Sequence, residues 1–307
     1  HGIQVLDTQT KVLATYYTGT GSSLSSAVYY RTADSSTDAG SWMSTGLASN
    51  GSTILSIGPL FYIPGDPIAT AVYACVQTAA YNYVLYYSTN GTSFAPLAAT
   101  TDSSTPYIDA TTNGTYDYFI TASQVLTLTG LATASSATPT DAAPGTGNAY
   151  TNLGGIWGDA GGTFSGTGDL YMTANNSILR STDGGSHWSV VVASHAAPSG
   201  GANLIFNKIA ETEAGSYKAL LIGSTTSGYW VLTPGASDVT VADPSSNYQA
   251  SDLRTSAITM LFVDLSAGDN ATPPVSPTGT DLVFAGGNAV GLWESYYTGN
   301  IPTFVQD

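Results

Sequence analysis

Short apolar runs of strand length, separated by turns rich in Gly, Ser, Thr and Asn, follow one another along nearly the whole chain. No apolar stripe with a helical period of 3.6 residues appears, so the pattern predicts β-strands rather than helices. A strand rich in Tyr, Phe and small residues recurs about every fifty residues, which indicates an internal repeat. Its copies are predicted at residues 11–17, 70–76, 115–121, 168–173, 217–223 and 280–286.

Each copy of this recurring strand has further strand-length runs around it. First strands are predicted ahead of the copies, at residues 3–6, 54–63, 107–110, 153–157, 204–209 and 258–265. Third strands are predicted at 27–30, 83–87, 124–128, 177–180, 228–232 and 290–293, and fourth strands at 189–192, 239–242 and 303–306. The third unit gives the weakest signal for a fourth strand.

Six four-stranded units of about fifty residues predict an all-β fold, a six-bladed β-propeller of four-stranded antiparallel blades. No shift in composition divides the chain, so we predict a single domain over residues 1–307. The stretches 132–148 and 269–280, which are rich in small residues and Pro, are predicted to be long loops.

The turn with the most specific chemistry is the octet Ser181-Thr182-Asp183-Gly184-Gly185-Ser186-His187-Trp188, between two predicted strands. An Asp in such a turn accepts hydrogen bonds from backbone N–H groups two residues on, and the Gly pair tolerates a positive φ. The Trp supplies a large apolar anchor for the returning strand. Two shorter turns repeat the pattern, one with Ser36, Asp38 and Trp42 and the other with Ser88, Asn90 and Phe94.

These turns resemble the Asp-box, or BNR repeat, of sialidase-like β-propellers, whose pattern is Ser-x-Asp-x-Gly-x-x-Trp. All four positions are filled by Ser181, Asp183, Gly185 and Trp188, and each shorter turn lacks one residue relative to the octet. The resemblance implies that the boxes are folding devices between the third and fourth strands of a blade. It also implies that a ligand binds on the opposite face, where the loops between second and third strands and between successive blades lie.

The loops on that implied ligand face contain aromatic, amide and charged side chains. Rings that stack on the C–H faces of sugars, beside oriented hydrogen-bonding groups, suit carbohydrate binding. The candidate ligand-binding residues are Tyr81, Asn82, Tyr150, His195, Tyr248, Asp252 and Arg254.

Composition and charge narrow the class of partner. The 307 residues are 42% hydrophobic, enough for a sizeable core, but only 9% are charged. A net charge of −15 with six basic residues makes nucleic acid and anionic membrane surfaces poor partners, because both attract clustered Lys and Arg. No run approaches 18 apolar residues, so no membrane insertion is predicted.

A few residues bear on the cellular location of the protein and on the cofactors that it could bind. The single cysteine, Cys75, rules out an internal disulfide framework and is expected to be a buried small hydrophobe. A surface of Ser, Thr, Asn, Gly and Tyr, and a chain that begins at His1 rather than Met, favour a secreted or cell-surface protein. We expect no cofactor and no metal site, because no Cys/His spacing suits zinc and Gly161-Gly162-Thr163 lacks the Lys of a phosphate loop.

The resemblance raises the question of catalysis. Sialidases hold the substrate carboxylate with three arginines, but Arg31 and Arg180, two of the three in this chain, precede box turns, so sialidase activity is not expected. Another glycoside hydrolase would need a pair of carboxylates around the central channel. The candidates are Asp109, Asp159 and Asp264 near the ends of first strands, whereas Glu211, Glu213 and Glu294 are predicted on the box side and outside the strands.

Three functions stay open from the sequence. The favoured hypothesis is a secreted or surface-exposed carbohydrate-binding, lectin-like β-propeller without catalysis, whose partner is a glycan or polysaccharide. The alternatives are a glycoside hydrolase that uses Asp carboxylates in the central channel, and a structural protein that assembles with a protein partner or with itself. Two close, inward-facing carboxylates would favour the hydrolase, and a large flat apolar patch would favour assembly.

Overall fold

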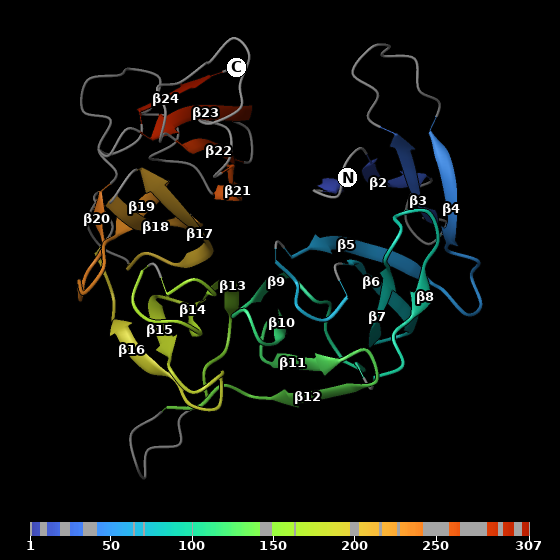
Figure 1. Ribbon diagram of the computed structural model, residues 1–307, viewed down its shortest axis with the longest axis horizontal. Coiled ribbons are helices and arrows are strands. Elements are labelled where there is room, and N and C mark those ends of the chain that lie inside the picture. The colour runs from blue at the N-terminus through green and yellow to red at the C-terminus, as the bar shows by residue number, and fades with distance from the viewer. Residues whose placement is uncertain are drawn as a thin grey trace. The chain divides into compact units, whose positions relative to one another are not determined.

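The computed structural model describes residues 2–6, 11–18, 25–32, 42–63, 65–69, 71–99, 101–141, 149–162, 164–196, 203–214, 217–225, 228–241, 258–264, 281–287, 291–297 and 303–306. The chain divides into two compact units, His1–Thr138 and Pro139–Asp307. Every regular element in the described residues is a β-strand (Figure 1). Nothing in these ranges forms a helix with the length and apolarity needed to cross a bilayer.

The first unit contains three four-stranded sheets. The first sheet is β1 (Gly2–Leu6), β2 (Lys11–Thr18), β3 (Ser25–Thr32) and β4 (Met43–Ala48); the second is β5 (Ser56–Tyr62), β6 (Val72–Ala79), β7 (Asn82–Ser88) and β8 (Ala95–Pro96); the third is β9 (Asp109–Thr112), β10 (Asp117–Ile120), β11 (Val125–Gly130) and β12 (Thr133–Ala137).

The second unit also contains three four-stranded sheets. The fourth sheet is β13 (Leu153–Asp159), β14 (Asp169–Ala174), β15 (Ser177–Ser181) and β16 (Ser189–Val192); the fifth is β17 (Phe206–Ala214), β18 (Tyr217–Ser224), β19 (Tyr229–Leu232) and β20 (Thr240–Val241); the sixth is β21 (Ile258–Asp264), β22 (Asp281–Gly287), β23 (Gly291–Tyr297) and β24 (Thr303–Gln306).

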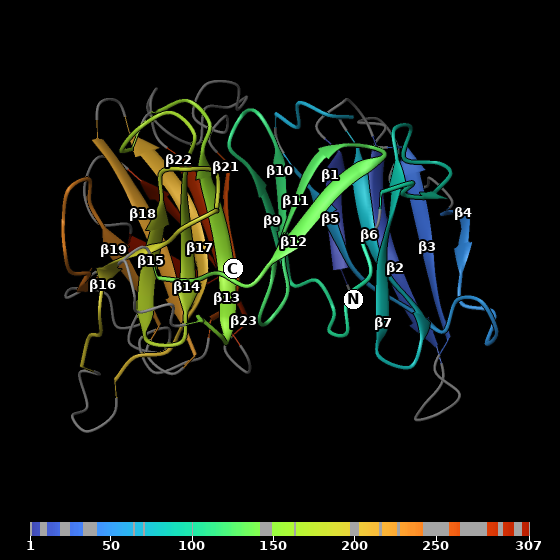
Figure 2. The same ribbon diagram turned by 90° about the horizontal axis from the view of Figure 1, so that it is seen from below.

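Each sheet is an antiparallel meander in which every strand pairs with the next one in the chain (Figure 2). The first strand of four sheets carries a β-bulge, which bends the strand and increases its twist. The register shifts lie between Ile57 and Leu60, Leu153 and Ile156, Phe206 and Lys208, and Ile258 and Met260. The predicted all-β class and the four-stranded antiparallel units are therefore confirmed.

Three of the second strands are buried over most of their length. All residues of β10 and β14 are buried, as are the first five of β6. A strand covered on both faces shows a continuous run of apolar and small residues rather than alternation, which explains why these strands were the clearest repeat in the sequence.

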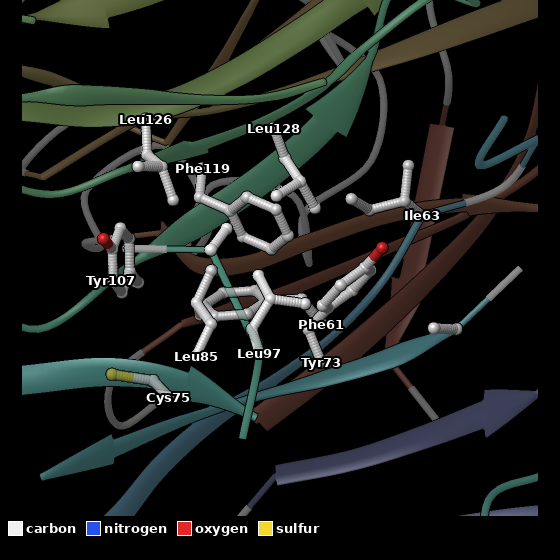
Figure 3. Close-up of a cluster of buried hydrophobic side chains, with 12 residues drawn as sticks. Phe61, Ile63, Tyr73, Cys75, Leu85, Leu97, Tyr107, Phe119, Leu126 and Leu128 are labelled. Atoms are coloured by element: carbon white, nitrogen blue, oxygen red, sulfur yellow. The ribbon is translucent and has the colours of Figure 1, made fainter. Parts of the chain in front are cut away.

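Two apolar clusters show how neighbouring sheets pack within a unit. In the first unit, Phe61, Tyr73 and Cys75 of the second sheet meet Phe119 and Leu126 of the third sheet (Figure 3). Phe119 is the centre of this cluster, because Phe61, Tyr73 and Tyr107 each place a ring edge-on to it, with centroids 4.9 to 6.1 Å away. Cys75 is fully buried here, as the sequence predicted.

The second unit has a corresponding cluster between its fourth and fifth sheets. Tyr171 and Ile178 of the fourth sheet pack in one cluster with Phe206, Ile222 and Trp230 of the fifth. Burial of such large side chains is the main favourable contribution to folding, at about 25 cal/mol for each Å² of apolar surface removed from water.

The prediction of a loop over residues 132–148 is wrong for residues 133–137. Residues Thr133–Ala137 form β12, which pairs with β11 at the edge of the third sheet (Figure 1). Its sequence, Thr-Ala-Ser-Ser-Ala, has no apolar residue larger than Ala, and the strand is mostly exposed. Backbone pairing and the packing of the small Ala134 against the core hold this edge strand, so its sequence shows no hydrophobic pattern. The second predicted loop, 269–280, lies outside the described residues.

The three Glu residues were also predicted wrongly, because each lies within a strand. Strand β17 continues through Glu211 and Glu213, and Glu294 lies inside β23. In the register of β17 with β18, Glu213 lies opposite Lys218. Backbone pairing therefore extends this hairpin beyond the apolar run at residues 204–209, as far as Ala214 and Tyr217.

Candidate functional site

The octet at residues 181–188 joins β15 to β16, the third and fourth strands of their sheet. Asp183 Oδ1 accepts hydrogen bonds from Ser181 Oγ at 2.8 Å and from the His187 N–H at 2.9 Å. Its other oxygen lies 2.7 Å from His187 Nδ1. The Gly185 N–H donates to Ser181 Oγ at 2.9 Å, and Gly184 and Gly185 have φ of 71° and 85°. Burial alone would raise the pKa of Asp183, but the hydrogen bonds from His187 and Ser181 lower it.

Trp188 closes the octet as a buried anchor. The side chain is fully buried, and its indole N–H donates to the Gly185 carbonyl at 3.0 Å. Its backbone N–H donates to the Thr140 carbonyl at 3.1 Å. The turn is therefore fixed to the segment that precedes the first strand of the same unit.

The turn between β7 and β8 repeats this hydrogen-bond pattern with Asn in place of Asp. Ser88 Oγ donates to Asn90 Oδ1 at 3.1 Å, and the Gly91 N–H donates to Ser88 Oγ at 2.9 Å. Asn90 Oδ1 also accepts the N–H groups of Thr92 and Ser93, at 2.8 and 3.1 Å. Phe94 is partly buried and packs against the core of the unit.

The turn between β3 and β4 is described only at its end. Ser36 and Asp38 lie outside the described residues. Trp42 is 44% exposed, and the Arg31 guanidinium carbon lies 6.0 Å from the centre of its ring. The three similar turns thus occupy the same place in three sheets, each between the third and fourth strands.

A polar hollow of about 260 Å³ lies beside the octet, lined by Arg180, Thr182, Asp183, His187 and Ser189. Its charged groups are engaged with other residues of the chain, since Arg180 pairs with Asp169 and His187 with Asp183. Ser189 Oγ donates to the Arg180 carbonyl. Among the described residues no Tyr, Trp or Phe lines the hollow, and its side chains support the turn.

Tyr81 lies in the two-residue turn between β6 and β7, and Asn82 is the first residue of β7. Both are at the connection between a second and a third strand, as expected. Tyr81 has a φ of 58° and its side chain is 81% exposed. Asn82 Nδ2 donates to Thr78 Oγ1 at 3.3 Å, which orients the amide beside Tyr81.

The other candidate ligand residues are placed separately. Tyr150 precedes β13 with its N–H donating to the Pro139 carbonyl, and burial together with the charge of Asp141 raises its pKa. His195 follows β16; its ring packs 4.7 Å from that of Trp230, and Nδ1 lies 2.9 Å from Asp238 Oδ1. Tyr248, Asp252 and Arg254 lie outside the described residues.

Asp109, Asp159 and Asp264, the candidate carboxylates for a hydrolase, differ from one another in where they lie on their strands. Asp159 is buried at the end of β13, where Oδ2 accepts three backbone N–H groups from residues 164–166, at 2.8 to 3.2 Å. Asp109 begins β9 rather than ending it, so it lies at the opposite end of a first strand. Asp264 ends β21, but its side chain is not described. Asp159 therefore organises a loop and is not open to a substrate.

Sequence reasoning missed three buried carboxylates. Asp66, Asp117 and Asp169 are each no more than 6% exposed. Asp66 and Asp117 meet at the Tyr73 hydroxyl, and Asp169 pairs with Arg180. No local motif joins Asp66 to Asp117, since they are far apart in the sequence.

Within the described ranges, no group of three His, Cys, Asp or Glu side chains is arranged to hold a metal ion.

Comparison with known proteins relates this chain to β-propellers by structure. No protein-family model and no curated protein matches it. The GH74 xyloglucanase from Xanthomonas campestris superimposes with a TM-score of 0.58 and 15% identity, over 99% of this chain and 45% of the xyloglucanase. YCF48 from Cyanidioschyzon merolae gives a TM-score of 0.52 and 12% identity, over 100% of this chain and 84% of YCF48.

Both neighbours are β-propeller proteins, so the fold of this chain is propeller-like. The chain spans less than half the length of the xyloglucanase. At 12% and 15% identity the likeness relates the folds and not the activities, because one fold hosts many functions.

Proposed function

We propose that this protein is a secreted or surface-exposed carbohydrate-binding propeller without catalysis, built from six blades with Asp-box turns. Its glycan contacts lie in the loops between second and third strands and between successive blades. Tyr81, in the turn between β6 and β7, is the observation that carries the proposal. Tyr150, His195, Tyr248, Asp252 and Arg254 are proposed as further contacts.

The backbone and exposure of Tyr81 are hard to explain by folding alone. A φ of 58° lies in the left-handed region, where residues other than Gly, Asn and Asp are strained. The turn between β14 and β15 also contains a left-handed residue, at its first rather than its second position, and there the residue is Asn175, with a φ of 52°. Packing does not compensate Tyr81, because its side chain is 81% exposed. An outlier of this kind supports a functional role for the ring.

The chemistry of the turn suits a sugar. The exposed ring offers a flat apolar face to the C–H groups of a pyranose, and Asn82 offers an oriented amide beside it. The similarity in fold to an enzyme named as a xyloglucanase is compatible with a glycan ligand.

Binding is favoured over hydrolysis by the state of four buried carboxylates in the described residues. Hydrolysis needs two carboxyl groups that a substrate can reach from both sides of the scissile bond. Asp66 and Asp117 meet in the core, and Asp159 and Asp169 are buried and engaged in hydrogen bonds.

A glycan array with the purified chain tests the proposal, using Tyr81→Asn and, as a matched control, Tyr116→Asn. Tyr116 is 39% exposed but lies in a loop between first and second strands. We expect selective binding by the wild type, a loss of at least about tenfold in affinity with Tyr81→Asn, and unchanged binding with Tyr116→Asn. Absence of binding to every glycan, or equal loss in both variants, would overturn the proposal. Cleavage of a bound glycan would instead favour the hydrolase.

A further inference from the structure

Two carboxyl groups from different sheets meet in the core of the first unit. Asp66 lies in the connection between β5 and β6, and Asp117 begins β10 of the third sheet. The Tyr73 hydroxyl lies 3.0 Å from Asp66 Oδ2 and 3.3 Å from Asp117 Oδ2. Asp117 and Tyr73 are completely buried, and Asp66 is 6% exposed. Two ionised carboxylates that meet at one hydroxyl group would repel each other strongly in so apolar a place.

We propose that Asp66 and Asp117 share one proton, carried by Asp117, and that the pair forms a pH-sensitive latch between the second and third sheets of the first unit. This inference is independent of the proposed glycan binding. It rests on counting hydrogens at the three side chains.

The donors around Asp66 identify it as the ionised partner. Oδ1 accepts the N–H groups of Ile68 at 2.7 Å and Ala69 at 3.0 Å. Oδ2 accepts the N–H of Ala71 at 3.1 Å and the Tyr73 hydroxyl at 3.0 Å. All four donors stabilise the ionised form of Asp66, so Asp66 is the partner that gives up its proton.

The contacts of Asp117 favour a proton on its carboxyl group. A tyrosine hydroxyl has one hydrogen, and Tyr73 gives it to Asp66. That one hydrogen cannot fully serve Asp117 as well, at 3.3 Å, whereas a protonated Asp117 can itself donate to the Tyr73 oxygen or to Asp66. Asp117 Oδ1 is buried without a hydrogen-bond partner, which is far less costly for a neutral acid than for a carboxylate.

The groups around the pair offer no compensating positive charge. Tyr73 of β6 and Asp66 are the titratable groups that act on Asp117, together with the Thr112 hydroxyl of β9. Cys75 and Tyr107 belong to the adjoining apolar cluster, and neither is cationic (Figure 3). Among the residues acting on Asp66 or Asp117 in the described ranges, none is Lys, Arg or His.

The directions of the two pKa shifts agree with a proton on Asp117 and an ionised Asp66. Burial, followed by the hydrogen bond with Asp66 and its negative charge, raises the pKa of Asp117 to about 8. Burial alone would raise the pKa of Asp66, but the hydrogen bonds from Asp117 and from the backbone of Ile68, Ala69 and Ala71 lower it.

The raised pKa of Asp117 sets the direction in which the stability of the protein changes with pH. An unfolded Asp ionises near pH 4, so between about pH 4 and about pH 8 the folded protein holds one proton more than the unfolded chain. The contribution of Asp117 to stability is complete below that window and falls as the pH rises through it. The unfolding equilibrium constant should rise by up to about tenfold for each pH unit. Asp66 acts on the acid side, where its contribution is lost as the pH falls.

Denaturant unfolding of the full chain at pH 5 and pH 8, at constant ionic strength, tests the latch with Asp117→Asn. Asn is neutral, has the same shape and can donate to Tyr73. We expect Asp117→Asn to remove about one proton from the pH dependence of unfolding. Asp159→Asn is the control, because Asp159 is buried but accepts only backbone N–H groups among its described hydrogen bonds. It should keep the wild-type slope, and an unchanged slope in Asp117→Asn would overturn the proposal.

A second measurement uses only the wild type, so it does not depend on how the variants fold. Carbon-13 NMR of labelled Asp carboxyl groups should reveal one acid still protonated at pH 6, which titrates near pH 8. Protection of the Ile68, Ala69 and Ala71 amides against hydrogen exchange should fall as that group ionises. The amides of residues 164–166, which bind Asp159, should not follow it. If every Asp titrates below about pH 5, the inference is wrong.

Discussion

One oxygen of Asp169, Oδ2, accepts two hydrogen bonds from the guanidinium of Arg180, from Nε at 3.0 Å and from Nη2 at 2.6 Å. Ser165 Oγ donates to the same oxygen at 2.6 Å. The side chain of Asp169 is 8% exposed and that of Arg180 is 35% exposed. Burial alone would lower the pKa of Arg180, but the pairing with Asp169 raises it, so Arg180 stays charged.

Removal of this charge should therefore be costly. We expect Asp169→Asn to reduce the free energy of unfolding by about 1–3 kcal/mol, less than a fully buried pair because Arg180 is partly solvated. Asp238→Asn breaks the more exposed pair with His195 and should change stability by less than about 0.5 kcal/mol. Chemical denaturation of both variants makes the comparison. Equal effects would mean that burial does not set the strength of the Asp169 pair.

Two glycines in equivalent bulges should respond differently to Ala. A Cβ on Gly154 of β13 would lie 2.6 Å from the Cα of Asn207, on the backbone of β17. A Cβ on Gly58 of β5 would meet only ordinary contacts, 3.5 Å or more from Cys75. We expect Gly154→Ala to cost more than about 2 kcal/mol and Gly58→Ala to stay within about 1 kcal/mol of the wild type. Thermal unfolding distinguishes them, and a well-tolerated Gly154→Ala would contradict the close approach of β13 and β17.

The strain at Tyr81 predicts an opposite response of stability and binding. Asn tolerates the left-handed backbone, so Tyr81→Asn should raise the free energy of unfolding by about 0.5–1 kcal/mol while it weakens glycan binding. The reciprocal change, Asn175→Tyr, should lower stability by a similar amount. Unfolding curves of both variants measure this. A marked destabilisation by Tyr81→Asn would show that the ring packs on the protein, and the case for its role in binding would fail.

The Cys75 thiol should not react with thiol reagents while the protein is folded. The thiol is fully buried, and burial raises its pKa to about 11. Because the thiolate is the reactive form, a thiol reagent at pH 8 should not label the native chain. Labelling should appear with unfolding, so its rate reports opening of the first unit. Prompt, complete labelling of the native protein would contradict the observed burial.

Local pattern was sufficient for most strands. The second strands near residues 70–76, 168–173 and 217–223 correspond to β6, β14 and β18, because burial on both faces leaves a strong apolar signal. The turns at Ser88 and Ser181 were also predictable, since their side chains bond to backbone groups within a few residues. Edge strand β12 was missed because backbone pairing, not apolar side chains, defines it.

The sequence by itself thus determined the all-β class, the four-strand repeat and the chemistry of the box turns, all of which depend on interactions between near neighbours. Only the tertiary structure decided which carboxylates are buried and how they are paired. Asp66 meets Asp117 at the Tyr73 hydroxyl, and Asp169 pairs with Arg180, because the fold brings separate segments of the chain together. The free energy of a buried charge depends on what lies around it in space, and that is set by packing rather than by position along the chain.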